Sequence, residues 1–240
     1  TPTVLTIHNG QYQGWFGYDK IDYIPEFNKL KIGFLDWNKI INPLATAIKC
    51  AWKVTTVSPS YLDEISIQMN GLEELLRLER PKTIGILNGI DTEVWNPKTD
   101  EMLHSNYDLN DFKLGKNKNK EQLCQEFNLD VSKPLFTFIG RLVDEKGADL
   151  LPEICNLALL EHPKEINILI LGSGNPDLEE KLKEIKNFHQ GNYNVYIGYN
   201  EKLAHQVYAG ADFLLMPSRV EPCGLNQMYS LRYGTIPIVR

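Results

Sequence analysis

Cysteine is scarce in this chain of 240 residues, and its four cysteines are widely spaced. Cys50, Cys124, Cys155 and Cys223 form no Cys-x-x-Cys pair, which argues against a zinc site and against a disulfide framework. We therefore expect no metal centre. Free thiols are typical of a reducing compartment, so the cysteine pattern favours a cytoplasmic protein.

Long apolar runs and an excess of positive charge are also missing. No apolar segment approaches the roughly 18–20 residues that cross a bilayer, so we expect no membrane association. The formal net charge is −6, which gives no overall electrostatic attraction to nucleic acid. Any anionic ligand must therefore be held by a few local cations.

Several catalytic signatures are absent as well. There is no GxxxxGK[ST] phosphate loop, no HExxH zinc motif and no GxSxG nucleophile elbow. No signal peptide is visible, and the first residue is Thr1 rather than an initiator Met, so we expect a fragment of a longer protein.

Length and composition fit a soluble globular protein, with 42% hydrophobic and 23% charged residues. The length allows one large domain or two small ones. Residues 96–120 are polar and end in the cationic run from Lys113 to Lys120, which predicts a solvated linker. We place a domain boundary near residue 115, with one domain over residues 1–115, linker included, and a second over residues 116–240.

Apolar segments alternate with amphipathic ones in the second domain. Such alternation predicts an α/β fold with a parallel sheet that helices cover on both faces. The predicted strands are 135–139, 166–171, 194–198, 212–216 and 235–239, and the predicted helices are 119–128, 148–161, 177–188, 201–209 and 224–233.

The first domain shows a weaker form of the same pattern. Predicted strands end at Ile7, Val57 and Ile86, a helix is predicted over residues 38–51, and Ser60 is the predicted N-cap of the next helix.

The most informative segment runs from Ser218 to Gln227. It follows the apolar run Phe213–Pro217 and places a carboxylate (Glu221), a thiol and a glycine where a strand gives way to a helix. Ligands bind at this edge of an open α/β sheet, because helix N-termini direct their free N–H groups there. The alternative is an ordinary loop and helix start, in which Glu221 only complements the helix dipole.

A pair of cations follows another predicted strand. Gly140-Arg141-Leu142 and Glu145-Lys146-Gly147 place a guanidinium and an ammonium group in a loop that leads into a helix. Arg binds phosphate oxygens bidentately and Lys supplies a point charge, so the pair suits a diphosphate. The alternative is surface charge neutralised by Asp144 and Glu145.

Weaker signals end other predicted strands. Gly172-Ser173-Gly174 lacks the third glycine and the downstream acid of a dinucleotide fingerprint, so we expect no nicotinamide cofactor. His8 is a candidate catalytic residue, the amides and the carboxylate of Asn88–Asp91 suit a sugar site, and Tyr199 suits stacking on a base. Each also has a structural interpretation, as a core histidine, an Asn-Gly turn and a packing tyrosine respectively.

Taken together, these segments resemble the bacterial glycogen synthase and plant starch synthase family over nearly the whole chain. Each motif alone is weak, but six in the family's order are specific. They are Thr6–Asn9 with Tyr12–Gly14, Thr55–Tyr61, Gly85–Asp91, Gly140–Leu142 with Lys146–Gly147, Leu171–Gly174, and Pro217–Arg219 with Glu221–Leu225. The resemblance implies a GT-B fold of two Rossmann-like, doubly wound parallel-sheet domains, the first incomplete here and the second nearly complete. The exposed edges of an incomplete first sheet favour self-association between copies of the chain.

The resemblance also implies an activity, the transfer of glucose from ADP-glucose to the non-reducing end of an α-1,4-glucan with retention of configuration. The implied partners are this nucleotide sugar and the glucan, ADP is the product, and no cofactor or metal is required. His8 and Asn88 are expected to reach the sugar from the first domain. The implied catalytic residues are Glu221, Arg141, Lys146 and His8, and the implied donor-binding residues are Asn88, Gly140, Tyr199, Cys223, Gly224 and Leu225.

The family's chemistry gives these residues their roles. Arg141 and Lys146 hold the donor phosphates and stabilise the charge on the leaving diphosphate, while Glu221 contacts the donor glucose. The family's second carboxylate position, eight residues after Glu221, holds Tyr229. We therefore expect front-face attack, in which the leaving phosphate helps to deprotonate the acceptor hydroxyl.

Two family motifs are missing, a Lys-x-Gly-Gly-Leu loop near the N-terminus and a Thr-Gly-Gly-Leu loop after Arg240. We expect the chain to correspond to about the middle half of a complete enzyme and, alone, to have little or no transferase activity. Two other interpretations stay open: a nucleotide-sugar or glucan binding module without turnover, and a related retaining transferase with another donor or acceptor. The two cations do not distinguish ADP-glucose from UDP-glucose.

Overall fold

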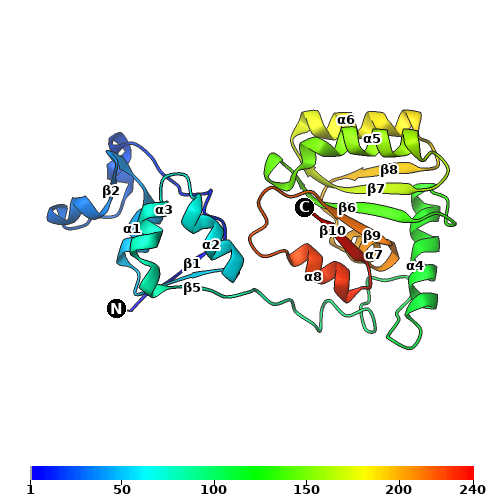
Figure 1. The fold of residues 1–240 in the computed structure, drawn as a ribbon, viewed down its shortest axis with the longest axis horizontal. Helices are drawn as coiled ribbons and strands as arrows, with labels where there is room; N and C mark the ends of the chain where they lie inside the picture. The colour runs from blue at the N-terminus through cyan, green and yellow to red at the C-terminus, as the bar shows by residue number, and fades with distance from the viewer. Residues whose placement is uncertain (1) are drawn as a thin grey trace. The chain divides into compact units, whose positions relative to one another are not determined.

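The computed structural model describes residues 2–240. The chain divides between Asn88 and Gly89 into two compact units (Figure 1). No helix within residues 2–240 is both long enough and apolar enough to cross a membrane.

The first unit is built on a three-stranded parallel sheet in the order β1-β4-β5. Its three strands are short. The strands are β1 (Val4–Ile7), β4 (Lys53–Thr56) and β5 (Thr83–Gly85), the helices are α1 (Pro43–Cys50), α2 (Pro59–Ile67) and α3 (Glu73–Leu78), and a small antiparallel pair joins β2 (Asp36–Trp37) to β3 (Ile40–Ile41).

Helix α2 begins two residues earlier than predicted. Ser58, rather than Ser60, is the N-cap, and its hydroxyl accepts a hydrogen bond from the Tyr61 N–H at 3.0 Å. Pro59 then occupies the first helical position, where a missing N–H costs nothing. The helix predicted over 38–51 is shorter than predicted, because β3 and the turn before it occupy its first residues.

The second unit contains a five-stranded parallel sheet in the order β10-β9-β6-β7-β8. Every strand and helix predicted here from alternation is present, with shifted ends. The strands are β6 (Leu135–Leu142), β7 (Asn167–Gly174), β8 (Tyr193–Ile197), β9 (Phe213–Met216) and β10 (Ile236–Val239), and the helices are α4 (Phe112–Phe127), α5 (Leu151–Glu161), α6 (Pro176–Phe188), α7 (Glu201–Gly210) and α8 (Leu225–Arg232).

Helices cover both faces of this sheet. Ile168 and Ile170 of β7 pack with α5 and α6, whereas Leu169 and Leu171 of the same strand pack with α4 and α7 (Figure 1). Side chains along a strand alternate between faces, so a strand covered on both faces is apolar throughout. The continuous apolar runs of the sequence therefore predicted a buried parallel sheet correctly.

The prediction that Lys113–Lys120 forms a solvated linker is wrong, because this run lies inside α4. Gly115 packs against Tyr107 so closely that a β-carbon would overlap the tyrosine side chain. The Lys116 ammonium donates to two main-chain carbonyls at 3.1 Å, and its burial lowers the pKa of Lys116 to about 8. One face of the helix is therefore buried although its sequence is charged.

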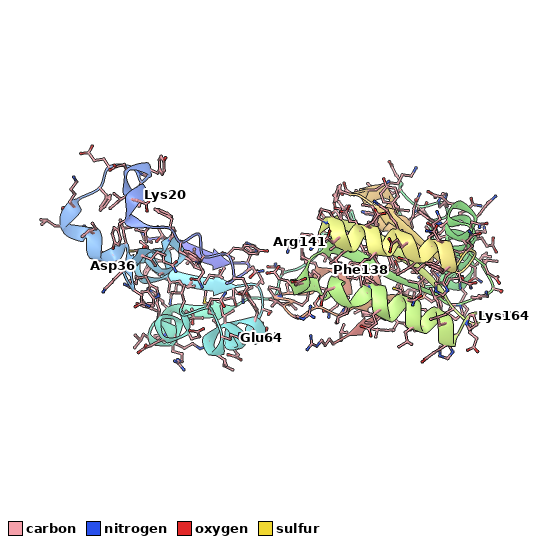
Figure 2. All side chains as sticks on the ribbon, turned by 90° about the horizontal axis from the view of Figure 1, so that it is seen from above. Lys20, Asp36, Glu64, Phe138, Arg141 and Lys164 are labelled. Atoms are coloured by element: carbon pink, nitrogen blue, oxygen red, sulfur yellow. The ribbon has the colours of Figure 1, made fainter. Side chains whose placement is uncertain are left out.

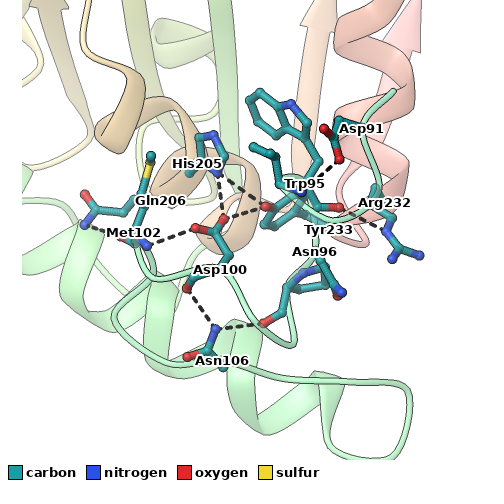
Figure 3. Close-up of polar contacts among 12 residues, drawn as sticks. Asp91, Trp95, Asn96, Asp100, Met102, Asn106, His205, Gln206, Arg232 and Tyr233 are labelled. Atoms are coloured by element: carbon teal, nitrogen blue, oxygen red, sulfur yellow. Dashed lines mark hydrogen bonds and ion pairs between the residues drawn. The ribbon is translucent and has the colours of Figure 1, made fainter. Parts of the chain in front are cut away.

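The segment before α4, which we had assigned to the first domain, packs within the second unit (Figure 3). Buried Asp100 accepts hydrogen bonds from His205 Nδ1, at 2.7 Å, and from the Tyr233 hydroxyl. The Trp95 ring stacks between His205 and Tyr229, with both ring centroids 3.8 Å away. These contacts place the division at residue 88 rather than near residue 115.

Replacing Asp100 with alanine should destabilise the second unit. The change leaves two buried donors without their acceptor, so we expect the free energy of unfolding to fall by about 2–4 kcal/mol. Urea unfolding followed by tryptophan fluorescence measures this loss. Glu184→Ala, at an exposed position of α6, is the control and should change stability little. Equal losses in the two variants would contradict the role given to Asp100.

Candidate functional site

The functional loops of the second unit follow β6 and β9, at the carboxyl ends of two paired strands. The chain runs from β6 outward through β7 to β8 and then returns, so that β9 pairs with the other side of β6. Such a reversal of strand order leaves a crevice beside the strand ends, which is where open α/β sheets bind ligands. The loop after β6 carries Lys146, and the loop after β9 carries Glu221.

These two loops bring together two of the predicted catalytic groups. Lys146 Nζ lies 2.7 Å from Glu221 Oε2, and Ser218 Oγ donates to the same oxygen at 2.9 Å. Both paired side chains are about one-quarter exposed, at 23% and 24%. An arriving anion can therefore reach the ammonium group, and it must compete with the Glu221 carboxylate for it.

Arg141 lies near the end of β6 and is more open to solvent, with 57% of its side chain exposed. Its guanidinium is 3.3 Å from Glu145 Oε2. The structural alternative, surface charge neutralised within the loop, therefore holds in part for Arg141. It does not describe Lys146, whose carboxylate partner comes from the loop after β9.

The loop after β6 approaches the end of β9 very closely. Gly147 has φ of +66°, and a β-carbon at this position would overlap the main-chain carbonyl of Pro217. Positive φ and close approach both select glycine. The sequence singled out Gly147 only as a neighbour of Lys146, and its packing role appears only in the fold.

Glycine also begins helix α8. Gly224 has φ of +84° and, as the N-cap residue, has no side chain to cap the helix. The first amides of α8 are therefore oriented by the main chain alone, next to Cys223 and Leu225. Helix N-terminal N–H groups attract anions and hydroxyl oxygens. The main-chain role of Cys223, Gly224 and Leu225 in donor binding stays a prediction.

A pocket of about 240 Å³ lies at the carboxyl ends of β6, β7 and β8. Three predicted residues, Gly140, Arg141 and Tyr199, line it. Tyr199 is 86% exposed, so the alternative of a packing tyrosine does not hold. The full lining is Ile139, Gly140, Arg141, Leu171, Gly172, Ser173, Gly198, Tyr199, Asn200, Ala204 and Asn226.

Two asparagines of this pocket were not predicted. Asn200 caps α7, and its side-chain oxygen accepts from the Leu203 N–H at 2.9 Å. Asn226 donates to the Ile139 carbonyl at 2.7 Å and so joins the first turn of α8 to β6. The cap could have been found from an Asn before an apolar helix. The Asn226 contact spans 87 residues and leaves no local pattern.

His8 and Asn88 belong to the first unit. His8 directly follows β1 and is exposed, which excludes the interpretation as a core histidine. Asn88 follows β5, and its N–H donates to the Val57 carbonyl at 3.2 Å. Both residues therefore lie beyond the carboxyl ends of parallel strands of the first sheet.

Tyr229 has a structural role in this chain. Its ring stacks on Trp95, and burial is the main cause of the raised pKa of its hydroxyl. No group of three or more His, Cys, Asp or Glu side chains suited to a metal ion occurs within residues 2–240.

The close approach of Gly147 can be tested with a matched glycine. Gly191 also has positive φ, +83°, but nothing lies within 4 Å of the position its β-carbon would take. Positive φ strains alanine at both sites, but only the β-carbon at residue 147 overlaps Pro217. We therefore expect Gly147→Ala to lower the free energy of unfolding by about 1–3 kcal/mol more than Gly191→Ala does. Urea unfolding of both variants measures the difference, and equal costs would show that the contact is loose.

Comparison with known proteins identifies the family. The description "Starch synthase catalytic domain" matches residues 1–78, and "Glycosyl transferases group 1" matches residues 119–240. The chain therefore belongs to the glycosyl transferases of group 1. Within that group it is similar in its two matched segments to glycogen and starch synthases, as the relatives below show. The recognised resemblance and the α/β, GT-B fold class are thus confirmed.

Individual relatives agree with this assignment. The chain is 65% identical to a glycogen synthase of Flavobacterium johnsoniae over 99% of its own length, and 44% identical to one of Marinobacter nauticus. It covers 50% and 49% of those two proteins, so it spans about half the length of the curated relatives it matches.

Two solved structures resemble the chain to different degrees. The catalytic domain of starch synthase IV from Arabidopsis thaliana, bound to ADP and acarbose, matches all of this chain and 50% of that one, with a TM-score of 0.89 and 32% identity. Anabaena Alr3699/HepE, in complex with UDP and glucose, covers 99% of this chain and 52% of that one, with a TM-score of 0.59 and 16% identity, which supports the fold alone.

Proposed function

We propose that the protein containing this chain transfers glucose from ADP-glucose to the non-reducing end of an α-1,4-glucan, with retention of configuration. The observation that carries the proposal is the Lys146–Glu221 pair, whose charged groups are 2.7 Å apart where the strand order reverses. Strand β6, which precedes the loop of Lys146, also carries Gly140 and Arg141, which line the pocket. The relatives named above are glycogen synthases, and the starch synthase structure holds ADP and acarbose, which supports this donor and acceptor.

The two cations act on the leaving group. Breaking the glucosyl–phosphate bond leaves negative charge on the diphosphate, and Arg141 and Lys146 stabilise that charge more in the transition state than in the ground state. Glu221 accepts hydrogen bonds from the donor glucose. In the structure the Glu221 carboxylate is paired with the Lys146 ammonium group. The donor diphosphate displaces this carboxylate from Lys146, which leaves Glu221 able to bind the sugar.

Attack occurs on the face from which the diphosphate leaves. The bond from the anomeric carbon to the phosphate oxygen breaks through an oxocarbenium-like transition state, and a bond to the acceptor hydroxyl oxygen forms. The hydroxyl proton passes to the departing phosphate. Tyr229 stands at the family's second carboxylate position, and its ring is stacked on Trp95, so this position supplies no carboxylate for a double displacement. A glucosyl-enzyme ester trapped by rapid quench would contradict this mechanism.

The remaining predictions complete the proposal. A contact of His8 and Asn88 with the sugar stays a prediction, as does a place for Tyr199 on the nucleoside side of the donor. The reaction needs neither a cofactor nor a metal, and the protein acts in the cytoplasm. Self-association through the edges of the first sheet also stays a prediction.

The proposal is tested in the complete protein with Lys146→Ala and Glu221→Gln. Each removes a group that acts in the transition state, so we expect glucose transfer to fall by about 10²-fold or more. Radiolabelled glucan extension measures transfer, and calorimetry measures ADP binding, which Lys146→Ala should weaken. Lys164→Ala is the control, because Lys164 lies at the far end of the second unit from Arg141 (Figure 2).

Two results would contradict the proposal. Full activity in both variants would remove these residues from the reaction. Binding of ADP without glucose transfer by the unchanged complete protein would instead identify a binding module.

A further inference from the structure

Two residues outside the predicted site join its two loops. Arg219, in the loop after β9, and Asp149, in the loop after β6, form a two-pronged ion pair. Arg219 Nη1 lies 2.5 Å from Asp149 Oδ1, and Nη2 lies 2.8 Å from Oδ2. The same Nη1 also donates to the Asp144 carbonyl at 2.8 Å. The Arg219 guanidinium therefore contacts both a side chain and the main chain of the loop after β6.

The main chains of the two loops add further contacts. The N–H groups of Arg219 and Val220 both donate to the Glu145 carbonyl, at 2.8 and 3.1 Å. Gly147 packs against the Pro217 carbonyl on the other side of Lys146. The residue that carries the ammonium group is therefore held between two points of contact with the opposite loop.

This ion pair contributes little to stability by itself. Its side chains are 38% and 35% exposed, and exposed ion pairs contribute at most about 1 kcal/mol. Its two-pronged geometry is directional, however, and lysine cannot reproduce it. The pKa of Asp149 is lowered, first by its hydrogen bond to Arg219, so the pair is charged at neutral pH.

We propose that Arg219 and Asp149 are positioning residues, which hold the loop of Lys146 and the loop of Glu221 in the register that lets both groups contact the donor. Neither side chain is bonded to Lys146 or Glu221 in the structure described here; both act through the main chain of their loops. The inference rests on the proposed function, because it needs a donor diphosphate at this crevice.

The test uses Arg219→Lys, Asp149→Asn and the double variant in the complete protein. A small displacement of a reacting group can cost up to about 10²-fold, so we expect kcat/KM for ADP-glucose to fall about 10- to 100-fold in each single variant. The KM for the donor should rise and the KM for the glucan should stay unchanged. Loss of folded protein alone lowers kcat and moves neither KM. The double variant should be no worse than the poorer single one, because the pair acts as a unit.

The first unit supplies a matched control pair. Arg80 Nη2 lies 2.9 Å from Asp63 Oδ1, and both members of this exposed pair belong to the first unit and to neither functional loop. Arg80→Lys and Asp63→Asn should leave both KM values and kcat unchanged. Thermal unfolding should shift little for either pair.

Calorimetric titration with ADP separates the two proposals. If the complete protein binds ADP but transfers no glucose, the proposed function fails, and weaker ADP binding by Arg219→Lys and Asp149→Asn still supports the positioning role. If the variants bind ADP as tightly as the parent and match its donor KM, the positioning role is overturned. Absence of ADP binding by the parent overturns both.

Discussion

The ion pair between Lys146 and Glu221 depends on the order of strands in the second sheet. The two residues are 75 positions apart, and they meet because β9 returns past β7 and β8 to pair with β6. If β9 had continued outward next to β8, the loop of Glu221 would have opened at the edge of the sheet. The reversal thus places one cation and one carboxylate in a single crevice, which local sequence preference alone cannot do.

The loop of Glu221 is held on both sides. Before it, Arg219 joins the loop after β6 through Asp149. After it, α8 is fixed by the stack of Tyr229 on Trp95, and Arg232 Nε donates to the Trp95 carbonyl at 3.1 Å. Trp95 belongs to the segment 89–111, so this segment is a packed part of the second unit. Its contacts stabilise the helix whose N-terminus faces the crevice.

The sequence predicted the second sheet better than it predicted the site. Strands covered on both faces are continuously apolar, so β6 to β9 could be read directly. The run Lys113–Lys120 was misread, because counting charges says nothing about the single helix face on which Gly115 meets Tyr107. Motif order gave Arg141, Lys146 and Glu221. It could not give the pairing of Lys146 with Glu221 or of Arg219 with Asp149, because pairing over 70 or more residues leaves no trace in local spacing.

Three cations at the carboxyl ends of β6 and β9 are each paired with a carboxylate: Arg141 with Glu145, Lys146 with Glu221 and Arg219 with Asp149. These carboxylates neutralise the cations, so no positive patch persists at these strand ends of a protein with net charge −6. An incoming anion must therefore bind these cations more strongly than the carboxylates that it displaces. A diphosphate does so, since it carries more negative charge and enough oxygens to meet Arg141 and Lys146 together, whereas a monovalent anion meets one cation at a time. In the proposed function the carboxylates thus favour a diphosphate over a monovalent anion, and the Arg219–Asp149 pair keeps its partner and holds the two loops in place.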